Sequence, residues 1–339
     1  MLAQVPQEQT FTTRNGLRVI LQERHDQARL CLHLRVDVPP EKATPAQRQW
    51  LMASLRASGA GGQRRTVLER RHAERGMTLV AWATADSLAW TLEADIRDTD
   101  DAFELLAHDV FRPALEEAPV SEAVAFRATL GFPVSDPGPL TVLERFALHR
   151  RLVRPEQAVL IVRGDLGLAQ AKAQVLLHLG TWAPSPEAPL PNREFGAPAS
   201  TTLMAGSPSW GDAASRMLGT LVLQARLKDD PSVVLETSEE AGPWLFHPRP
   251  GVDEPAFLRR LENLAQTPVS SEELNSARRR WKAQRTSLPL HPREDTAALA
   301  WAALHGDPAP QVEALTPEAL TKLFQTRLTV PHLKVHPGK

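Results

Sequence analysis

Histidine and carboxylate side chains at short, fixed spacings are what a metal-dependent active site would need. The 339-residue chain has eleven histidines, but no His is followed three residues later by Glu and then by His, and H-E-x-x-H is also absent. His332 and His336 are four residues apart in a short apolar run that predicts a strand. Their side chains would then be about 13 Å apart, too far for one metal ion.

Cys31 is the only cysteine, so no intrachain disulfide can form. A nucleophilic role for its thiol would need a nearby His and an electropositive setting. The residue lies in Leu30–Asp37, where apolar and polar residues alternate as in a strand. We therefore expect the thiol to pack beside a sheet as a small apolar group.

Composition and charge argue against several classes of partner. With 23% charged residues and a formal net charge of −1, nothing favours nucleic acid or an anionic membrane surface. The densest basic run, Arg278–Lys282, would spread around most of a helix and would not form one face. Gly59–Gly62 lacks the Lys and the Ser or Thr of a phosphate-binding loop.

No window of the chain has the apolar length of a membrane span. Met1–Gln9 is polar and lacks the apolar run of a signal peptide. A cytoplasmic protein is therefore the default expectation, or an exported one if a signal peptide has been removed.

The elements that would position a site begin with a hairpin. Phe11–Glu23 runs through an Asn15-Gly16 pair into alternating apolar residues, the strongest short-range hairpin signal. Leu30–Asp37 predicts the next strand, and Thr44–Leu55 predicts a helix after it.

Later segments continue this mixture of helices and strands. Thr66 with Glu69, and Ser270 with Glu273, are capping-box pairs that predict helices over 67–75 and 272–284. Between and around them, alternation and helical spacing predict strands over 77–84 and 87–95 and a helix over 100–110. Antiparallel strands with helices on one face indicate an α+β fold.

The order of these first elements closely resembles the opening of the insulinase/pitrilysin family of zinc peptidases. In that family an N-G-L-R-V strand and a second strand precede a helix that carries H-x-x-E-H. Aligning that helix on Ala46 and Met52 puts Gln47, Trp50 and Leu51 where the two His and the Glu belong. A neutral amide, an indole and an isobutyl group cannot form a catalytic zinc site. The resemblance therefore implies a member without the zinc motif.

Two further family features are incomplete. The third zinc ligand would come from a later helix, and Glu122 lies nearest to that position. Active members also hold the substrate carbonyl with an Arg and a Tyr in a pattern like R-x-x-R-G-L-A-Y. The best match here starts at Arg226 and places Val233 where Tyr belongs, in a chain that has no Tyr at all. The resemblance leaves Arg226 as a candidate substrate-binding residue, against the alternative of an ordinary solvated Arg.

A proline-rich segment, Ala183–Asn192, predicts an extended linker between two halves that share weak internal similarity. We expect an N-terminal peptidase-like domain over 1–183, a linker over 184–199 and a shortened C-terminal α+β domain over 200–339. The two related domains would each have an antiparallel sheet with helices packed mainly on one face, as the family resemblance implies.

The leading hypothesis is a catalytically inactive subunit of a heteromeric insulinase/pitrilysin-type peptidase. By resemblance, a partner chain would supply H-x-x-E-H, zinc and the general base, and this chain, without a cofactor of its own, would form part of the chamber that encloses the peptide substrate. The alternative is a structural or assembly protein of peptidase descent with no proteolytic role. An enzyme with a relocated site is the third possibility and is disfavoured by the missing ligands.

Overall fold

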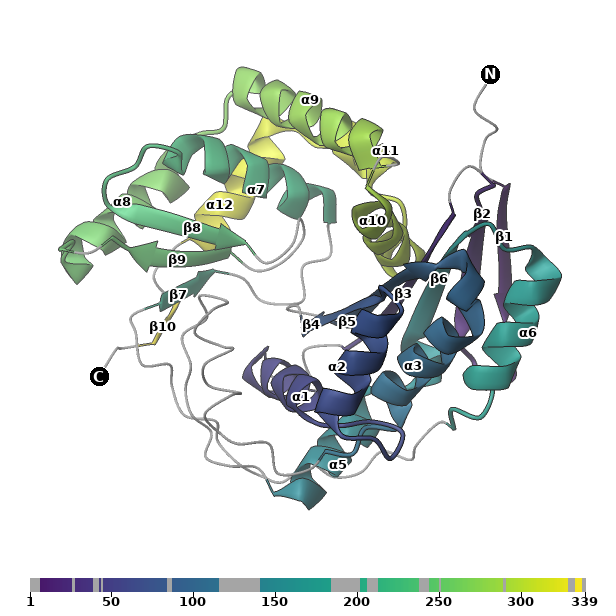
Figure 1. The fold of residues 1–339 in the computed structure, drawn as a ribbon. Coiled ribbons are helices and arrows are strands. Elements are labelled where there is room, and N and C mark those ends of the chain that lie inside the picture. Colours follow the sequence, from purple (N-terminus) through teal and green to yellow (C-terminus); the bar gives the residue numbers. More distant parts are fainter. Residues whose placement is uncertain are drawn as a thin grey trace. The chain divides into compact units, whose positions relative to one another are not determined.

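The computed structural model describes residues 7–25, 28–38, 43, 45–83, 87–115, 141–183, 202–205, 213–237, 244–249, 251–288, 291–328 and 333–336 (Figure 1). They cluster into two compact units. The first unit contains the described residues up to 183 together with 291–304, and the second contains 202–288 and 305–336. The predicted linker over 184–199 and Glu122 lie outside the described residues.

The first unit is built on a six-stranded sheet with the order β1-β2-β6-β3-β5-β4. All neighbouring strands are antiparallel except β2 and β6, which run parallel. The predicted antiparallel sheet is thus confirmed apart from this one pair. The strands are β1 (Gln7–Thr12), β2 (Arg18–Glu23), β3 (Arg29–Asp37), β4 (Thr78–Ala83), β5 (Ser87–Asp95) and β6 (Ala158–Gly164).

The predicted hairpin at Asn15-Gly16 is confirmed and has a specific local cause. β1 and β2 pair up to Thr12 opposite Arg18. Gly16 adopts φ +90, and a Cβ there would lie 2.9 Å from the Cβ of Glu156, so the turn requires glycine. Asn15 then fastens the turn, because its Nδ2 donates to the carbonyls of Leu179 at 2.9 Å and Trp182 at 2.8 Å.

Most helices of this unit cover one face of the sheet, as predicted. α1 and α3 pack on β4 and β5, and α6 packs on β2 (Figure 1). The apolar residues of β3 and β5 that pair across the ladder, such as Leu34 with Trp90, are fully buried on that face. The helices are α1 (Pro45–Ala57), α2 (Arg65–Glu74), α3 (Thr99–Phe111), α5 (Val142–Leu152) and α6 (Leu168–His178).

The predicted capping box at the start of α2 is wrong. The helix begins at Arg65, and its N-cap, Arg64, makes no side-chain capping bond. Glu69 instead accepts from Nε of Arg65 at 3.1 Å, one turn earlier on the same helix face, and so does not reach back to a cap.

The opposite face of the first sheet is covered by α10 (Pro292–His305), a helix from the far end of the chain. Ala300 packs in one buried cluster with Ile20 of β2 and with Val159 and Ile161 of β6. The predicted C-terminal domain over 200–339 therefore needs correction, because residues 291–304 belong by packing to the first unit. The sheet is covered on both faces.

Polar contacts fasten α10 to the same face. Arg163 of β6 forms an ion pair with Asp295, and Arg293 Nη2 lies 2.6 Å from Glu93 Oε2. The Cys31 thiol lies 3.6 Å from the hydroxyl of Thr296.

The second unit has a four-stranded, fully antiparallel sheet with the order β10-β7-β9-β8. Its core includes Trp244, whose Nε1 donates to Thr220 Oγ1 at 2.8 Å and whose ring meets Phe324 edge-on. No helix in the described residues is long and apolar enough to cross a bilayer. The elements are β7 (Thr202–Ala205), α7 (Ala213–Leu227), β8 (Val233–Thr237), β9 (Trp244–Pro248), α8 (Glu254–Gln266), α9 (Ser271–Ser287), α11 (Ala309–Ala314), α12 (Pro317–Arg327) and β10 (Leu333–His336).

The two units repeat one topology, which confirms the prediction of two related domains. In chain order, β3-α1-β4-β5-α3 and later α5-β6 correspond to β7-α7-β8-β9-α8 and later α12-β10, with α2 as an addition between α1 and β4 in the first unit. The strand orders β6-β3-β5-β4 and β10-β7-β9-β8 match, and every pair in both is antiparallel. α7 therefore occupies in the second unit the place that α1 occupies in the first.

Candidate functional site

The helix aligned with the family's zinc helix is present as α1, directly after β3. Gln47, Trp50 and Leu51 all lie on it, at the spacing i, i+3 and i+4 that gives one helix face. The Leu51 side chain is fully buried in the core. At the position of the motif's last residue the protein therefore has a packed apolar group, where the resemblance expects a His.

The residue between these positions, Arg48, was not anticipated from the sequence. Its guanidinium is fully buried, and Nη1 donates to the carbonyls of Val38 at 3.2 Å and Ala43 at 2.9 Å. These bonds hold the segment between β3 and α1 against the first turns of the helix. The aligned helix thus carries a permanent positive charge in a structural role.

Metal-ligating side chains are not gathered at one place in the described part of the chain. Across the ranges given above, no three His, Cys, Asp or Glu residues lie close enough to hold a metal ion. His336 lies in β10, as predicted for a strand, and its sequence neighbour His332 is outside the described residues.

The sheet face that α10 covers contains titratable groups whose burial keeps them uncharged. Burial raises the pKa of the Cys31 thiol to about 11, which favours the protonated thiol at neutral pH. Burial lowers the pKa of His33 to about 3, and its Nδ1 lies 2.7 Å from Thr91 Oγ1. The prediction that Cys31 packs beside the sheet is confirmed.

Arg226, the candidate substrate-binding residue, is a structural clamp. Its Nε and Nη2 donate to the two carboxylate oxygens of Glu273 at 2.7 and 3.0 Å. Its remaining donors bond the carbonyls of Leu264 at 3.4 Å, Thr267 at 3.0 Å and Pro268 at 2.8 Å. A guanidinium has five N–H donors, and all five are used. In this arrangement no donor is left for a peptide carbonyl, so we assign Arg226 to joining α7 with the turn between α8 and α9.

The same ion pair organises the start of α9. Ser270 Oγ accepts from the backbone N–H of Glu273 at 3.1 Å, and Glu273 Oε2 accepts from the backbone N–H of Ser270 at 2.9 Å. The predicted capping box is therefore confirmed. The hydrogen bond from Arg226 lowers the pKa of Glu273, which keeps this carboxylate ionised.

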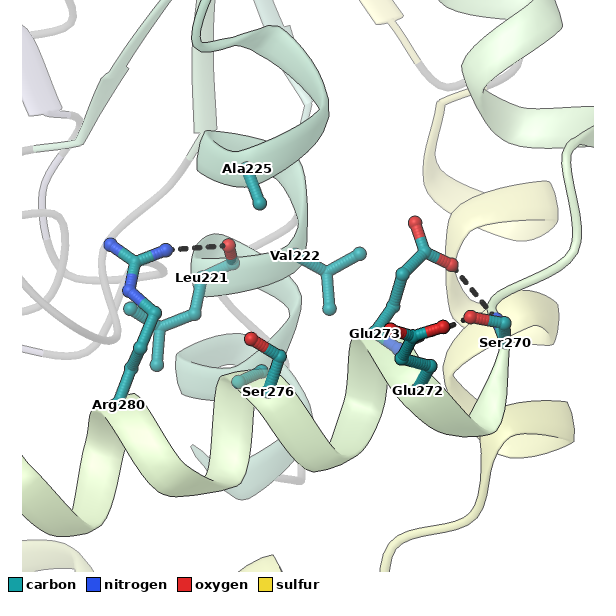
Figure 2. Close-up of a pocket in the computed structure, with 9 residues that line it drawn as sticks. Leu221, Val222, Ala225, Ser270, Glu272, Glu273, Ser276 and Arg280 are labelled. Carbon is teal, nitrogen blue, oxygen red and sulfur yellow. Dashed lines mark hydrogen bonds between the residues drawn. The ribbon is translucent and has the colours of Figure 1, made fainter.

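A cavity of about 240 Å³, which no sequence motif indicates, lies between α7 and α9 (Figure 2). Leu221 and Val222 of α7 and Ala277 of α9 form its apolar floor, and they are 6%, 1% and 3% exposed. Ser276 lies at its middle and Arg280 at one end, where Nη1 lies 3.4 Å from the Leu221 carbonyl. The other end is lined by Ser270, Glu272 and Glu273, and Ala225 completes the wall.

The described residues thus contain no assembled catalytic group at either place that the resemblance identifies. No family model matches the chain, and no curated protein matches it by sequence. Solved structures do match it along almost the whole length.

Three of these structures are informative. A protease from Helicobacter pylori superposes with a TM-score of 0.70 at 14% identity, covering 97% of this chain and 98% of that chain. A peptidase M16 inactive domain from Pseudomonas fluorescens has a TM-score of 0.66 at 16% identity, with 96% of each chain covered. The fold is that of the peptidase M16 proteins. The first half of the periplasmic protease PqqL from Escherichia coli has a TM-score of 0.55 at 14% identity, over 95% of this chain and 90% of that one.

The match to full-length PqqL also compares the lengths of the two proteins. This chain is covered to 98% by full-length PqqL but spans only 47% of that protease. The chain thus spans about half the length of that protease.

Proposed function

We propose that this chain is a non-catalytic member of the insulinase/pitrilysin-type peptidases that acts as one subunit of a heteromeric enzyme. One observation carries the proposal. In a fold shared with a domain described as an inactive M16 domain, the helix after β3 has Gln47, Trp50 and Leu51 at the aligned zinc positions, with Leu51 packed in the core.

In this proposal the partner subunit carries H-x-x-E-H, binds the zinc and activates the water that attacks the peptide carbonyl. This chain binds no zinc in the proposal; it forms part of the wall of the chamber and contacts the peptide substrate. The 47% coverage of PqqL supports a second chain of similar size, because a full-length relative is about twice as long.

The free edge of β4 is the part of the first unit best suited to contact a peptide. β4 ends the strand order, and no described strand pairs with its outer side. It also packs against α1. An extended peptide can add to such an edge through main-chain hydrogen bonds, which would hold it beside the helix that carries the catalytic groups in active relatives.

A peptidase-derived structural or assembly protein is the second candidate. The full internal bonding of Arg226 favours it, because the one residue retained from the substrate-holding pattern is used to stabilise the second unit. In that case no proteolytic role would accompany the fold.

The test is affinity purification of the tagged chain from its own host, with mass spectrometry and zinc analysis of what co-elutes. The proposal expects an H-x-x-E-H chain of the same fold in fixed ratio, with zinc that stays with that chain when the two are separated. Recovery of a large complex without any motif-bearing chain would favour the structural role. Cell fractionation of the same host would test the proposed cytoplasmic location.

A further inference from the structure

The cavity between α7 and α9 has opposite charges at its two ends and an apolar floor between them (Figure 2). The Arg280 guanidinium lies at one end and the Glu272 carboxylate at the other. Both side chains come from α9, so the helix fixes the separation of their Cα atoms along its axis. Eight residues of α-helix correspond to about 12 Å.

Both end groups retain capacity to bind a ligand. Arg280 is exposed, and the contact from its Nη1 to the Leu221 carbonyl is long, at 3.4 Å. Glu272 is also exposed, and no bond to its carboxylate is seen within the described residues. Glu273, in contrast, is fully engaged by Arg226 and by the capping box.

The middle of the cavity suits a short main chain with small side chains. Leu221, Val222 and Ala277 present an apolar floor, and the Ser276 hydroxyl lies beside it as a donor or acceptor. A volume of about 240 Å³ is too small for a folded element or a nucleotide-sized ring system with its phosphates. A purely anionic ligand would also meet the two carboxylates at the Glu272 end.

We propose that this cavity binds a short zwitterionic peptide of about three residues, with its carboxylate at Arg280 and its ammonium group at Glu272. An extended chain spans at most about 3.6 Å per residue, so three residues reach about 11 Å. That length is close to the axial distance between the Cα atoms of Glu272 and Arg280, whereas a single amino acid is much shorter. The preference for a peptide over another molecule with these end charges rests on the proposed function.

Short peptides are the products of a peptidase, so such a ligand would fit the proposed function. A binding site for them between two helices of the second unit would allow accumulated product to alter the stability of that unit. A bound peptide would act on the packing of α7 against α9, because most of the residues that line the cavity belong to these two helices.

The experiment is calorimetric titration of the full chain, without any partner, with tri-alanine. Parallel titrations use N-acetylated tri-alanine, tri-alanine amide and 6-aminohexanoate, which has the end charges but no peptide bond. The variants are Arg280→Gln and Glu272→Gln, with Arg279→Gln as the matched control because Arg279 is exposed on the same helix and does not line the cavity. Thermal unfolding of each variant verifies that the fold is retained.

The proposal expects saturable binding of tri-alanine that weakens about tenfold or more in Arg280→Gln and Glu272→Gln and stays within about twofold of the unaltered chain in Arg279→Gln. Each blocked peptide should lose binding to a similar extent. Absence of saturable binding up to about 10 mM, or equal binding by the blocked peptides, overturns the site. Equal binding of 6-aminohexanoate overturns the assignment to peptides. Because the partner chain is absent, none of these results bears on the heteromeric peptidase.

Discussion

Replacing Arg226 with Met should destabilise the second unit rather than impair a peptide contact. Met retains much of the side chain's apolar volume but removes all five hydrogen bonds. The Glu273 carboxylate loses a bidentate partner, and three carbonyls lose a charged donor. Phe324 also loses a guanidinium 5.8 Å from its ring centre.

The size of the loss follows from the exposure of the pair. Breaking a fully buried ion pair from one side costs about 3–5 kcal/mol, and a hydrogen bond to a charged group contributes about 1.5–3 kcal/mol. The Arg226 side chain is 10% exposed, but that of Glu273 is 34% exposed and keeps part of its hydration. We therefore expect the free energy of unfolding to fall by about 2–3 kcal/mol.

The assay is urea unfolding followed by tryptophan fluorescence, since Trp244 lies in the core of the same unit. Arg259→Met is the matched control, because Arg259 is an exposed residue of α8, and its effect should stay within about 0.5 kcal/mol. In a double-mutant cycle, Glu273→Gln should show strong coupling to Arg226→Met. An Arg226→Met variant as stable as Arg259→Met would refute the clamp and return Arg226 to the list of substrate-binding candidates.

Three further outcomes are expected. Asp295→Asn removes the charge opposite Arg163 and should lower the free energy of unfolding by about 2 kcal/mol, with faster amide exchange in α10; unchanged exchange would contradict the docking of that helix. Burial lowers the pKa of His33 to about 3 and of His149 to about 4, below the ordinary 6.5. Below about pH 6.5 the unfolded chain binds protons at these two His that the folded chain does not bind. The free energy of unfolding should therefore decline with falling pH, by up to about 1.4 kcal/mol per pH unit for each His. A urea midpoint that is flat between about pH 7 and pH 5 would contradict this. Leu51→His should cost about 2–4 kcal/mol, whereas Leu51→Met should cost under about 1.5 kcal/mol; equal urea midpoints would show that position 51 is not packed.

Local signals in the sequence predicted the fold where the deciding interactions are local. The hairpin at Asn15-Gly16 follows from a turn that only glycine allows at φ +90. The capping box of Ser270 and Glu273 formed, whereas Thr66 and Glu69 did not cap α2. Both pairs have the same spacing, so the difference depends on where the helix begins.

The docking of α10 could not be predicted in the same way. A helical pattern shows which residues share a face, but it does not show which sheet that face covers. The polar face of β3, with Cys31 and His33 among apolar neighbours, is buried because α10 and Thr296 arrive from more than 250 positions further along the chain. A hydrophobic pattern alone does not contain that pairing.

The residues of the candidate site show the same contrast between features visible in the sequence and contacts that form only in the fold. The loss of the zinc motif at Gln47, Trp50 and Leu51 is visible in the sequence itself, because an indole and an isobutyl group cannot ligate zinc. The sequence did not predict the role of Arg226, because its four bonding partners on α8, α9 and the turn between them come together only in the fold. Arg48 and the cavity lined by Arg280 have no sequence motif at all.

The most direct test of the proposed function is hydrolysis of a quenched fluorescent peptide by three samples. These are this chain alone, an H-x-x-E-H chain from the same organism alone, and the two together, with a Glu→Gln change in the partner's motif as the control for its activity. The account predicts no cleavage by this chain, enhanced zinc-dependent cleavage by the mixture, and loss of that cleavage with the altered partner. Metal-dependent turnover by this chain alone, or a partner that cleaves equally well without it and does not co-elute with it, would contradict the account.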